Sequence, residues 1–234
     1  MSVHLGFDHL GFDELVARMH GEPDDPDVAA DPLMAASYYS DVAWALSNLG
    51  ANGIAWLLDE APRVEQDEPR LRGVLLGLAR RDVPQAQLVA VRDVFRRHLT
   101  DSRPLIVMDA LSGLGGLQDT SSMGEVLALR EAESEWVRAE VLRYMQECAP
   151  AQATAMALEA LADGHFLVRE TAIDVIEELD VAGQYLDHIR PLLEDEHPDV
   201  RTAAEWAIEA AEESDEESDE ESDEAEESDE AGGR

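Results

Sequence analysis

The side chains with the greatest capacity for chemistry in this 234-residue chain are seven histidines and one cysteine. The histidines are scattered: His4, His9, His20, His98, His165, His188 and His197. The lone Cys148 excludes an internal disulfide and any multi-cysteine metal site. The chain also lacks Gly-x-x-x-x-Gly-Lys, Gly-x-Gly-x-x-Gly before a helix, and His-Glu-x-x-His. The sequence therefore predicts no catalytic, cofactor-binding or metal-binding residues, and Cys148 is interpreted as a half-buried apolar residue.

Two of the histidines, His165 and His197, occupy equivalent places in an internal repeat, which favours exposed turn positions for both. Aligning Val168-Arg169 with Val200-Arg201 gives a step of 32 residues. We call the first residue of each such pair the anchor. Continuing upstream at steps of 31, 31, 35 and 33 residues gives the anchors Val137, Ile106, Leu71 and Tyr38. Six copies at this spacing predict six stacked helical hairpins.

The columns of the repeat support helices. The positions four and eight residues after each anchor are apolar in all copies: Val42, Leu75, Ala110, Val141, Ala172 and Ala204, then Leu46, Ala79, Leu114, Met145, Ile176 and Ile208. This spacing is one face of an α-helix. The partner helices are expected near residues 10–20, 52–60, 84–99, 119–131, 150–163 and 182–194. No strand pattern appears, so the predicted fold is all-α.

The motif Asp-x-x-x-x-Val-Arg-x-x-Ala at 195–204, echoed at 163–172, resembles the HEAT repeat in the short form named after phycobilisome lyases. The resemblance covers about residues 30–211. It implies an α-solenoid, a right-handed superhelix whose second helices line a concave face that binds other proteins. Copy one departs from the pattern, with a Pro/Asp-rich loop at 21–32 and Tyr38-Tyr39 in place of Val-Arg, so it is either a true repeat or a cap.

Arginines recur one position after the anchor, at Arg72, Arg138, Arg169 and Arg201. Because the set repeats with the fold, a structural role is favoured over a catalytic one. Each guanidinium is expected to meet an acid of a neighbouring hairpin, such as Asp163 or Asp195, and so to form an Arg–Asp ladder.

Two further columns suggest a partner-binding surface. Acids at Asp41, Asp109 and Glu140, three residues after their anchors, either edge the groove as hydrated side chains or form a row for a basic partner or a cation. The position five residues after the anchor carries a large aliphatic residue in four successive copies, and in the family this position faces solvent. These side chains form either an exposed apolar stripe or a half-buried contact between hairpins. The predicted partner-binding residues are Leu76, Met108, Leu111, Leu142, Ile173, Asp41, Asp109 and Glu140.

Charge sets the class of partner. The chain has 53 acidic and 17 basic residues, all of the latter arginine, for a formal net charge of −36. Residues 212–230 hold fourteen acids in Glu-Ser-Asp-Glu repeats, which predicts a disordered tail at 212–234 and a folded domain at 1–211. That domain keeps 39 acids against 16 arginines, a net of −23. Such a field disfavours nucleic acid and anionic membrane.

The composition also bears on origin and location. An acidic, lysine-free surface suits a protein of multimolar intracellular salt, as in haloarchaea, with a high-GC bacterium as the alternative. No apolar run approaches a membrane span and no basic leader precedes one, so a cytoplasmic monomer is expected.

Two functions remain open from sequence. The first is a non-enzymatic scaffold or adaptor that binds a protein segment in its concave groove. The second is an accessory lyase or chaperone for a cofactor-bearing or chromophore-bearing protein, which rests only on the name of the repeat subfamily.

Overall fold

The computed structural model of the protein describes residues 6–213, and every regular element in that range is a helix. This confirms the all-α prediction. The chain divides into two compact units, Met1–Cys148 and Ala149–Arg234, of which residues 6–148 and 149–213 are described. The region predicted as one domain over 1–211 thus contains two units, and each is described by itself.

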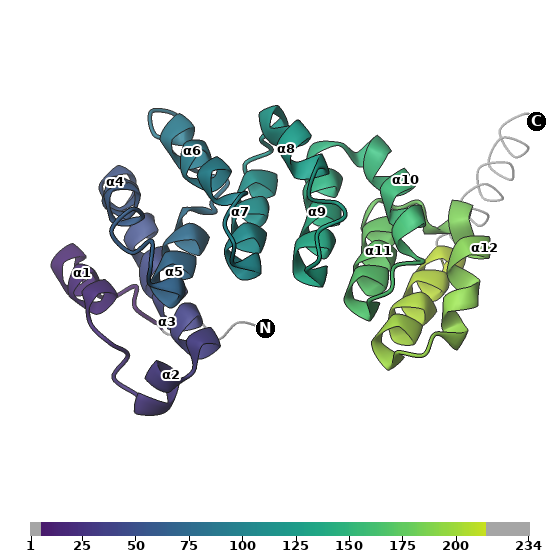
Figure 1. The fold of residues 1–234 in the computed structure, drawn as a ribbon, viewed down its shortest axis with the longest axis horizontal. Coiled ribbons are helices and arrows are strands. Elements are labelled where there is room, and N and C mark those ends of the chain that lie inside the picture. Colours follow the sequence, from purple (N-terminus) through teal and green to yellow (C-terminus); the bar gives the residue numbers. More distant parts are fainter. Residues whose placement is uncertain (1–5, 214–234) are drawn as a thin grey trace, which may run out of the picture. The chain divides into compact units, whose positions relative to one another are not determined.

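The first unit stacks helical hairpins in two rows (Figure 1). The row that carries the anchors, here called the anchor row, contains α3 (Pro32–Asn48), α5 (Glu68–Leu78), α7 (Pro104–Gly116) and α9 (Glu135–Cys148). The partner row contains α4 (Ala51–Glu60), α6 (Leu88–His98) and α8 (Met123–Leu127), the last preceded by the short 3-10 helix η1 (Thr120–Ser122). Two further helices, α1 (Phe12–His20) and α2 (Pro26–Ala30), precede α3.

The predicted register is confirmed by burial. The anchors Leu71 and Ile106 are fully buried, and so are Leu75 and Ala110 four residues later. In the anchor row, α5 packs against α3 and α7, and α9 packs against α7. The helices α3, α5 and α7 also pack against the partner row, through α4 for the first two and α6 for α7.

Aspartate and proline set where the helices of this unit begin. Asp31 accepts hydrogen bonds from the backbone N–H groups of Leu33 and Met34, and Pro32 occupies the first turn of α3. Asp25 caps α2 in the same way, with Pro26 in its first turn. The expected loop at 21–32 is therefore partly wrong, because these two Asp-Pro pairs make two helix starts.

The anchor helix of copy one, α3, contacts the end of α1, where later copies contact a preceding hairpin. The hydroxyl of Tyr39 donates to the carbonyl of Gly21 at 2.9 Å, and the Arg70 guanidinium donates to the carbonyls of Met19 and Gly21 at 3.0 and 2.9 Å. The last carbonyls of α1, which have no partner within the helix, are thus satisfied by side chains of α3 and α5.

The second unit contains α10 (Pro150–Ala160), α11 (Phe166–Glu178), η2 (Ala182–Tyr185), α12 (Leu186–Ile189) and η3 (Arg190–Glu194). A last helix spans residues 198–213. Its anchor Val200 and the column residue Ala204 are fully buried, as predicted. Glu212 and Glu213 are helical, so the helix runs past the predicted boundary at 211, and the predicted tail from residue 214 on lies outside the described residues.

Candidate interaction surfaces

The ion pair between Arg72 of α5 and Asp109 of α7 is bidentate and buried. Nε of Arg72 donates to Oδ2 of Asp109 at 2.7 Å, and Nη2 donates to Oδ1 at 3.2 Å. Arg72 is 7% and Asp109 1% exposed. Burial raises the pKa of Asp109, although the hydrogen bonds and charge of Arg72 oppose this rise. The expectation that Asp109 edges a groove is therefore wrong, because its carboxylate joins two hairpins.

Arg169 of α11 makes the same fork in the second unit. Its Nε and Nη2 donate to the two carboxylate oxygens of Asp195 at 2.8 and 2.7 Å, and its Nη1 donates to the carbonyl of Asp163 at 2.9 Å. Arg201 donates to the carbonyl of Asp195 at 2.7 Å. The hydrogen bond from Arg169 lowers the pKa of Asp195 despite partial burial. The predicted Arg–Asp ladder is confirmed for Arg72 and Arg169.

Arg138 and the two turn histidines complete the recurring set. Arg138 donates to the carbonyls of Ala132 and Glu133 at 2.8 and 3.0 Å and so holds the turn before α9. Nδ1 of His165 accepts from the backbone N–H of Leu167, and Nδ1 of His197 accepts from that of Asp199, each at 3.3 Å. Both rings are half-buried, so the turn location is confirmed and full exposure is not.

The other two acids of the predicted row differ from each other. Asp41 is 8% exposed, so the expectation of a hydrated edge is wrong for it as well. Glu140 is half-buried. Burial raises the pKa of Glu140, while the charge of Arg143 and a hydrogen bond with Ser112 oppose the rise. Glu140 is thus the one acid of the three that reaches the surface.

The aliphatic column is not an exposed stripe. Leu111, Leu142 and Ile173 are 0%, 3% and 0% exposed, and Leu76 is half-buried. The physical reason is visible at Ala43, the equivalent residue of α3, because a Cβ added to Gly77 of α5 would lie only 2.5 Å from the Ala43 Cβ. The fifth position after the anchor therefore faces the next helix of the row, and the predicted exposure is wrong for Leu111, Leu142 and Ile173.

In the anchor row, the side chains that reach the surface lie at repeat positions other than the fifth, and we call them the exposed strip. Trp136, one residue before its anchor, is 47% exposed. Leu105 occupies the equivalent position on α7, and Met108 follows one turn later on the same strip; both are half-buried. Of the predicted partner-binding residues, Met108 and Glu140 therefore remain at the surface of α7 and α9.

Trp136 is not among the predicted partner-binding residues, because that prediction rests on the aliphatic positions of the repeat. A signal was present: the position before the anchor is polar in several copies, as at Ser37, Arg70 and Asp199. A tryptophan in such a column is expected to be exposed. The same reasoning applies to Trp206, six residues after its anchor, which is 64% exposed.

The connection between α7 and α8 is held by a polar cluster around Asp119, which is 2% exposed. Nη2 of Arg96 donates to its Oδ2 at 2.8 Å, and the hydroxyls of Ser121 and Ser122 donate to its two oxygens at 2.8 and 2.6 Å. Burial alone would raise the pKa of Asp119, but these hydrogen bonds lower it. Tyr144 of α9 donates to the Asp119 carbonyl at 2.6 Å. The cluster is a structural support for the row.

Cys148 ends α9 as a free, half-buried thiol. Burial raises its pKa, although a hydrogen bond with Tyr144 opposes the rise. A raised pKa reduces the thiolate fraction at neutral pH, which supports the interpretation of Cys148 as a packing residue rather than a nucleophile.

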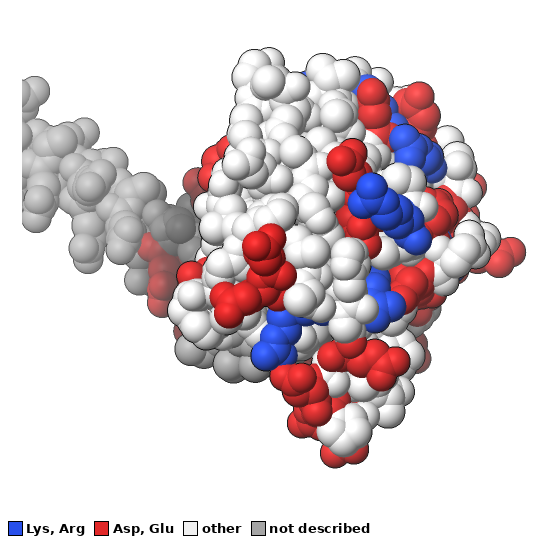
Figure 2. Space-filling model, turned by 90° about the vertical axis from the view of Figure 1, so that its left-hand side faces the viewer, with Lys and Arg blue, Asp and Glu red and all other residues white. Residues whose placement is uncertain are grey.

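Charges on the surface of the first unit are interleaved rather than segregated. Figure 2 views the molecule from the side of its N-terminal helices, where blue arginines lie beside red acidic side chains. The exposed ion pairs of the first unit include Arg18–Asp24 and Arg81–Glu147. Exposed pairs of this kind each contribute little to stability, on the order of 0–1 kcal/mol.

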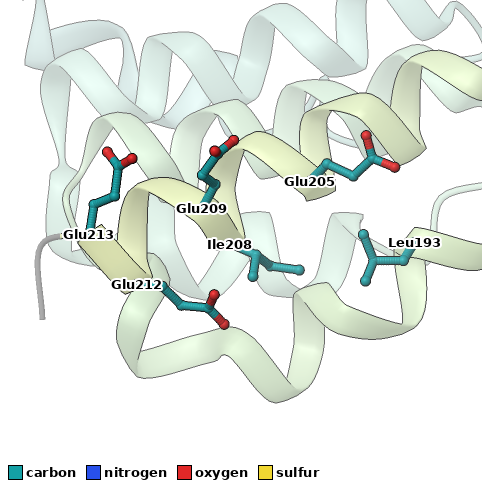
Figure 3. A pocket seen from close by; sticks show the side chains of 6 residues that line it. All are labelled: Leu193, Glu205, Ile208, Glu209, Glu212 and Glu213. Carbon is teal, nitrogen blue, oxygen red and sulfur yellow. The ribbon is translucent and has the colours of Figure 1, made fainter. Parts of the chain in front are cut away.

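Each unit has a hollow on its surface. In the first, Phe7, Leu10, Val28 and Tyr38 line a hollow of about 400 Å3 beside Arg18. In the second, a hollow of about 480 Å3 lies between η3 and the last helix, as Figure 3 shows. Within residues 6–213 no three His, Cys, Asp or Glu side chains are grouped to hold a metal ion. No helix in the described range is long and apolar enough to cross a membrane.

Residues 125–209 match a family model for HEAT repeats. This supports the resemblance found in the sequence and covers the copies with the clearest motif. The HEAT-matched segment includes both the turn held by Arg138 and the Arg169–Asp195 fork.

Two solved structures are similar to this chain at low sequence identity. An engineered protein from a structural genomics consortium shares 14% identity over 86% of this chain and 96% of its own, with a TM-score of 0.51. A designed armadillo repeat protein in complex with a (KR)4 peptide shares 14% identity over 86% of this chain and 100% of its own, with a TM-score of 0.44. No curated protein matches the chain in sequence. The likeness to the engineered protein shows a shared fold and nothing further.

Proposed function

We propose that the protein is a non-enzymatic interaction scaffold that binds a segment of a partner protein along the exposed strip of α7 and α9. Helical repeat folds are typical of such scaffolds, because stacked hairpins present an extended surface of regularly spaced side chains. The strip is defined by Leu105, Met108, Trp136 and Glu140. The observation that carries the proposal is Trp136, a 47% exposed indole on a helix whose other face is fully packed.

The physical case rests on what an exposed tryptophan does at an interface. Its large, rigid ring buries much apolar area at small cost in side-chain entropy, and tryptophans are enriched among the residues that dominate binding energy. Because α9 packs against α7, Trp136 and Leu105 occupy the same column on adjacent helices. Met108 lies one turn further along α7. A partner side chain docked on Trp136 would therefore find further apolar surface beside it.

The strip is also rigid and bordered by charge. The Arg72–Asp109 fork fixes α7, which carries half of the strip, to α5. A rigid surface loses little conformational entropy on binding. Glu140 adds a carboxylate that favours a partner segment with a basic residue near its apolar anchor.

The test is selection of peptides from a random display library against the full-length protein, followed by mapping of the bound peptide by NMR. Selected peptides should carry an apolar or aromatic anchor and should perturb the Trp136 indole signal. Trp136→Ser and Met108→Ser should each weaken binding by about tenfold. Val89→Ser on α6 is the matched control, since Val89 is 66% exposed in the partner row, and it should leave binding unchanged.

Two results would count against this proposal. If selected peptides perturb other signals and bind equally well to Trp136→Ser, the strip is not the binding surface. If Val89→Ser weakens binding as much as Trp136→Ser, the peptides recognise exposed apolar residues without regard to place.

A further inference from the structure

The hollow of the second unit combines an apolar floor with a rim of carboxylates. Leu193 of η3 and Ile208 of the last helix point toward each other across the hollow in Figure 3. Glu205, Glu209 and Glu213 follow one edge of that helix, and Glu212 lies beside the floor. Leu193 is 37% exposed and Ile208 9%, so a partner would reach the floor mainly at Leu193.

The repeat register explains why this face is unlike the others. Glu205 lies five residues after the anchor Val200, and the five preceding copies carry Ala43, Leu76, Leu111, Leu142 and Ile173 there. That column faces the next helix of the row, as the contact of Ala43 with Gly77 shows. The last helix therefore presents glutamates on the face that earlier helices use for apolar stacking. An apolar hairpin stacked there would bury these carboxylates without partners, which is strongly unfavourable.

The carboxylates are only partly neutralised by the protein itself. Arg190 pairs with Glu212 at 3.1 Å. No basic residue of the described range pairs with Glu205, Glu209 or Glu213. These three lie four residues apart on one helix face, where like charges repel each other. A ligand that brings positive charge to this edge would remove that repulsion.

We propose that this hollow docks a basic, amphipathic segment of a partner protein, with an aliphatic side chain between Leu193 and Ile208 and arginine or lysine side chains on the glutamate edge. The Arg190–Glu212 pair shows that a carboxylate beside the floor can pair with a guanidinium. The apolar floor gives the anchor and the carboxylates select for charge and orientation. This surface is separate from the strip on α7 and α9, so it stands or falls independently of the proposed function.

The experiment uses the full chain and a short synthetic peptide with two leucines one helical turn apart, flanked by arginines. A second peptide has serine in place of both leucines. Binding is measured by fluorescence anisotropy at about 0.5 M KCl, where long-range attraction is screened. The leucine peptide should bind, and the serine peptide should bind at least about tenfold more weakly. Binding should raise the melting temperature of the protein.

Matched variants separate the hollow from the general negative charge. The triple variant E205Q/E209Q/E213Q should weaken binding of the leucine peptide by about tenfold or more. The control E159Q/E177Q/D187N removes the same number of exposed charges elsewhere in this unit and should change binding less than about twofold. Leu193→Ser should weaken binding several-fold, whereas Leu33→Ser, at a 66% exposed residue of the first unit, should not. Melting curves of each variant establish that it is folded.

Three outcomes would overturn the proposal. Equal loss with the two triple variants would mean that the peptide responds to overall charge. Equal binding of the leucine and serine peptides would mean that the floor is not used. Self-association of the wild type that Leu193→Ser abolishes, together with no peptide binding, would identify a second copy of this chain as the occupant.

Discussion

Nε and Nη2 of Arg72 form a fork onto the two carboxylate oxygens of Asp109, and both residues are less than a tenth exposed. Arg169 and Asp195 repeat this geometry in the second unit. A fork of this kind satisfies two charges at once, but each partner alone is a buried charge without compensation. The pair therefore makes the stacking of two hairpins depend on both residues together.

Arg72→Ala should destabilise the protein by about 3–5 kcal/mol, because it leaves the Asp109 carboxylate buried and unpaired. Arg72→Met with Asp109→Leu should cost about 1 kcal/mol or less, because no charge is then buried. Arg81→Ala, which removes an exposed pair with Glu147, is the control and should cost less than about 1 kcal/mol. Urea unfolding of the wild type and these three variants measures the losses. Equal losses in Arg72→Ala and in the double variant would show that packing, not charge, holds this contact.

The Arg72→Ala defect should also depend on pH. Burial already raises the pKa of Asp109, and removal of Arg72 takes away the main opposing cause. A carboxyl with a raised folded pKa contributes stability below its unfolded pKa of about 3.9 and loses it as pH rises through the folded value. The difference in unfolding free energy between wild type and Arg72→Ala should thus be smaller at pH 4 than at pH 7. A difference that is constant over this range would contradict a neutral, buried Asp109 in the variant.

Leu111→Arg should unfold the first unit or destabilise it by at least about 4 kcal/mol, because Leu111 is fully buried and the guanidinium would have no partner. Val89→Arg, at a 66% exposed position, should change stability by less than about 0.5 kcal/mol. Thermal melts followed by circular dichroism compare the two. A Leu111→Arg variant that melts like wild type would restore the exposed stripe that the sequence suggested.

The contrast between Leu111 and Trp136 shows what the sequence could predict. The columns at the anchor and four and eight residues later were predicted because they are apolar in every copy. The fifth position is apolar as well, but a sequence pattern gives no direction for it, because a helix with neighbours on its flanks buries most of its circumference. Only a narrow strip stays exposed, and Trp136 lies on it. The Arg–Asp ladder was predictable from spacing, whereas the pairing of Arg72 with Asp109 required the stacking of α5 on α7.

Gly77→Ala should destabilise the protein by about 1–3 kcal/mol, although alanine is the better helix former. The added Cβ would lie 2.5 Å from the Ala43 Cβ and 2.9 Å from the Ala43 carbonyl carbon, so α3 and α5 would have to separate. Gly116→Ala is the matched control on α7, since nothing lies within 4 Å of its added Cβ. It should be neutral or stabilising by up to about 1 kcal/mol. If both substitutions stabilise, α3 and α5 are less closely packed than the structure shows.

Stability should rise strongly with salt. Residues 1–211 hold 39 acids and 16 arginines, so even complete pairing leaves a net charge of −23 that opposes compaction. Salt also weakens exposed ion pairs such as Arg18–Asp24, but these contribute little each, and relief of the net repulsion should dominate. The melting temperature should therefore climb between about 0.1 and 2 M KCl. The E205Q/E209Q/E213Q variant should climb less steeply, because it lacks three like charges on one helix. A melting temperature that is flat or falls over this range would show that pairing, not repulsion, governs the charged surface.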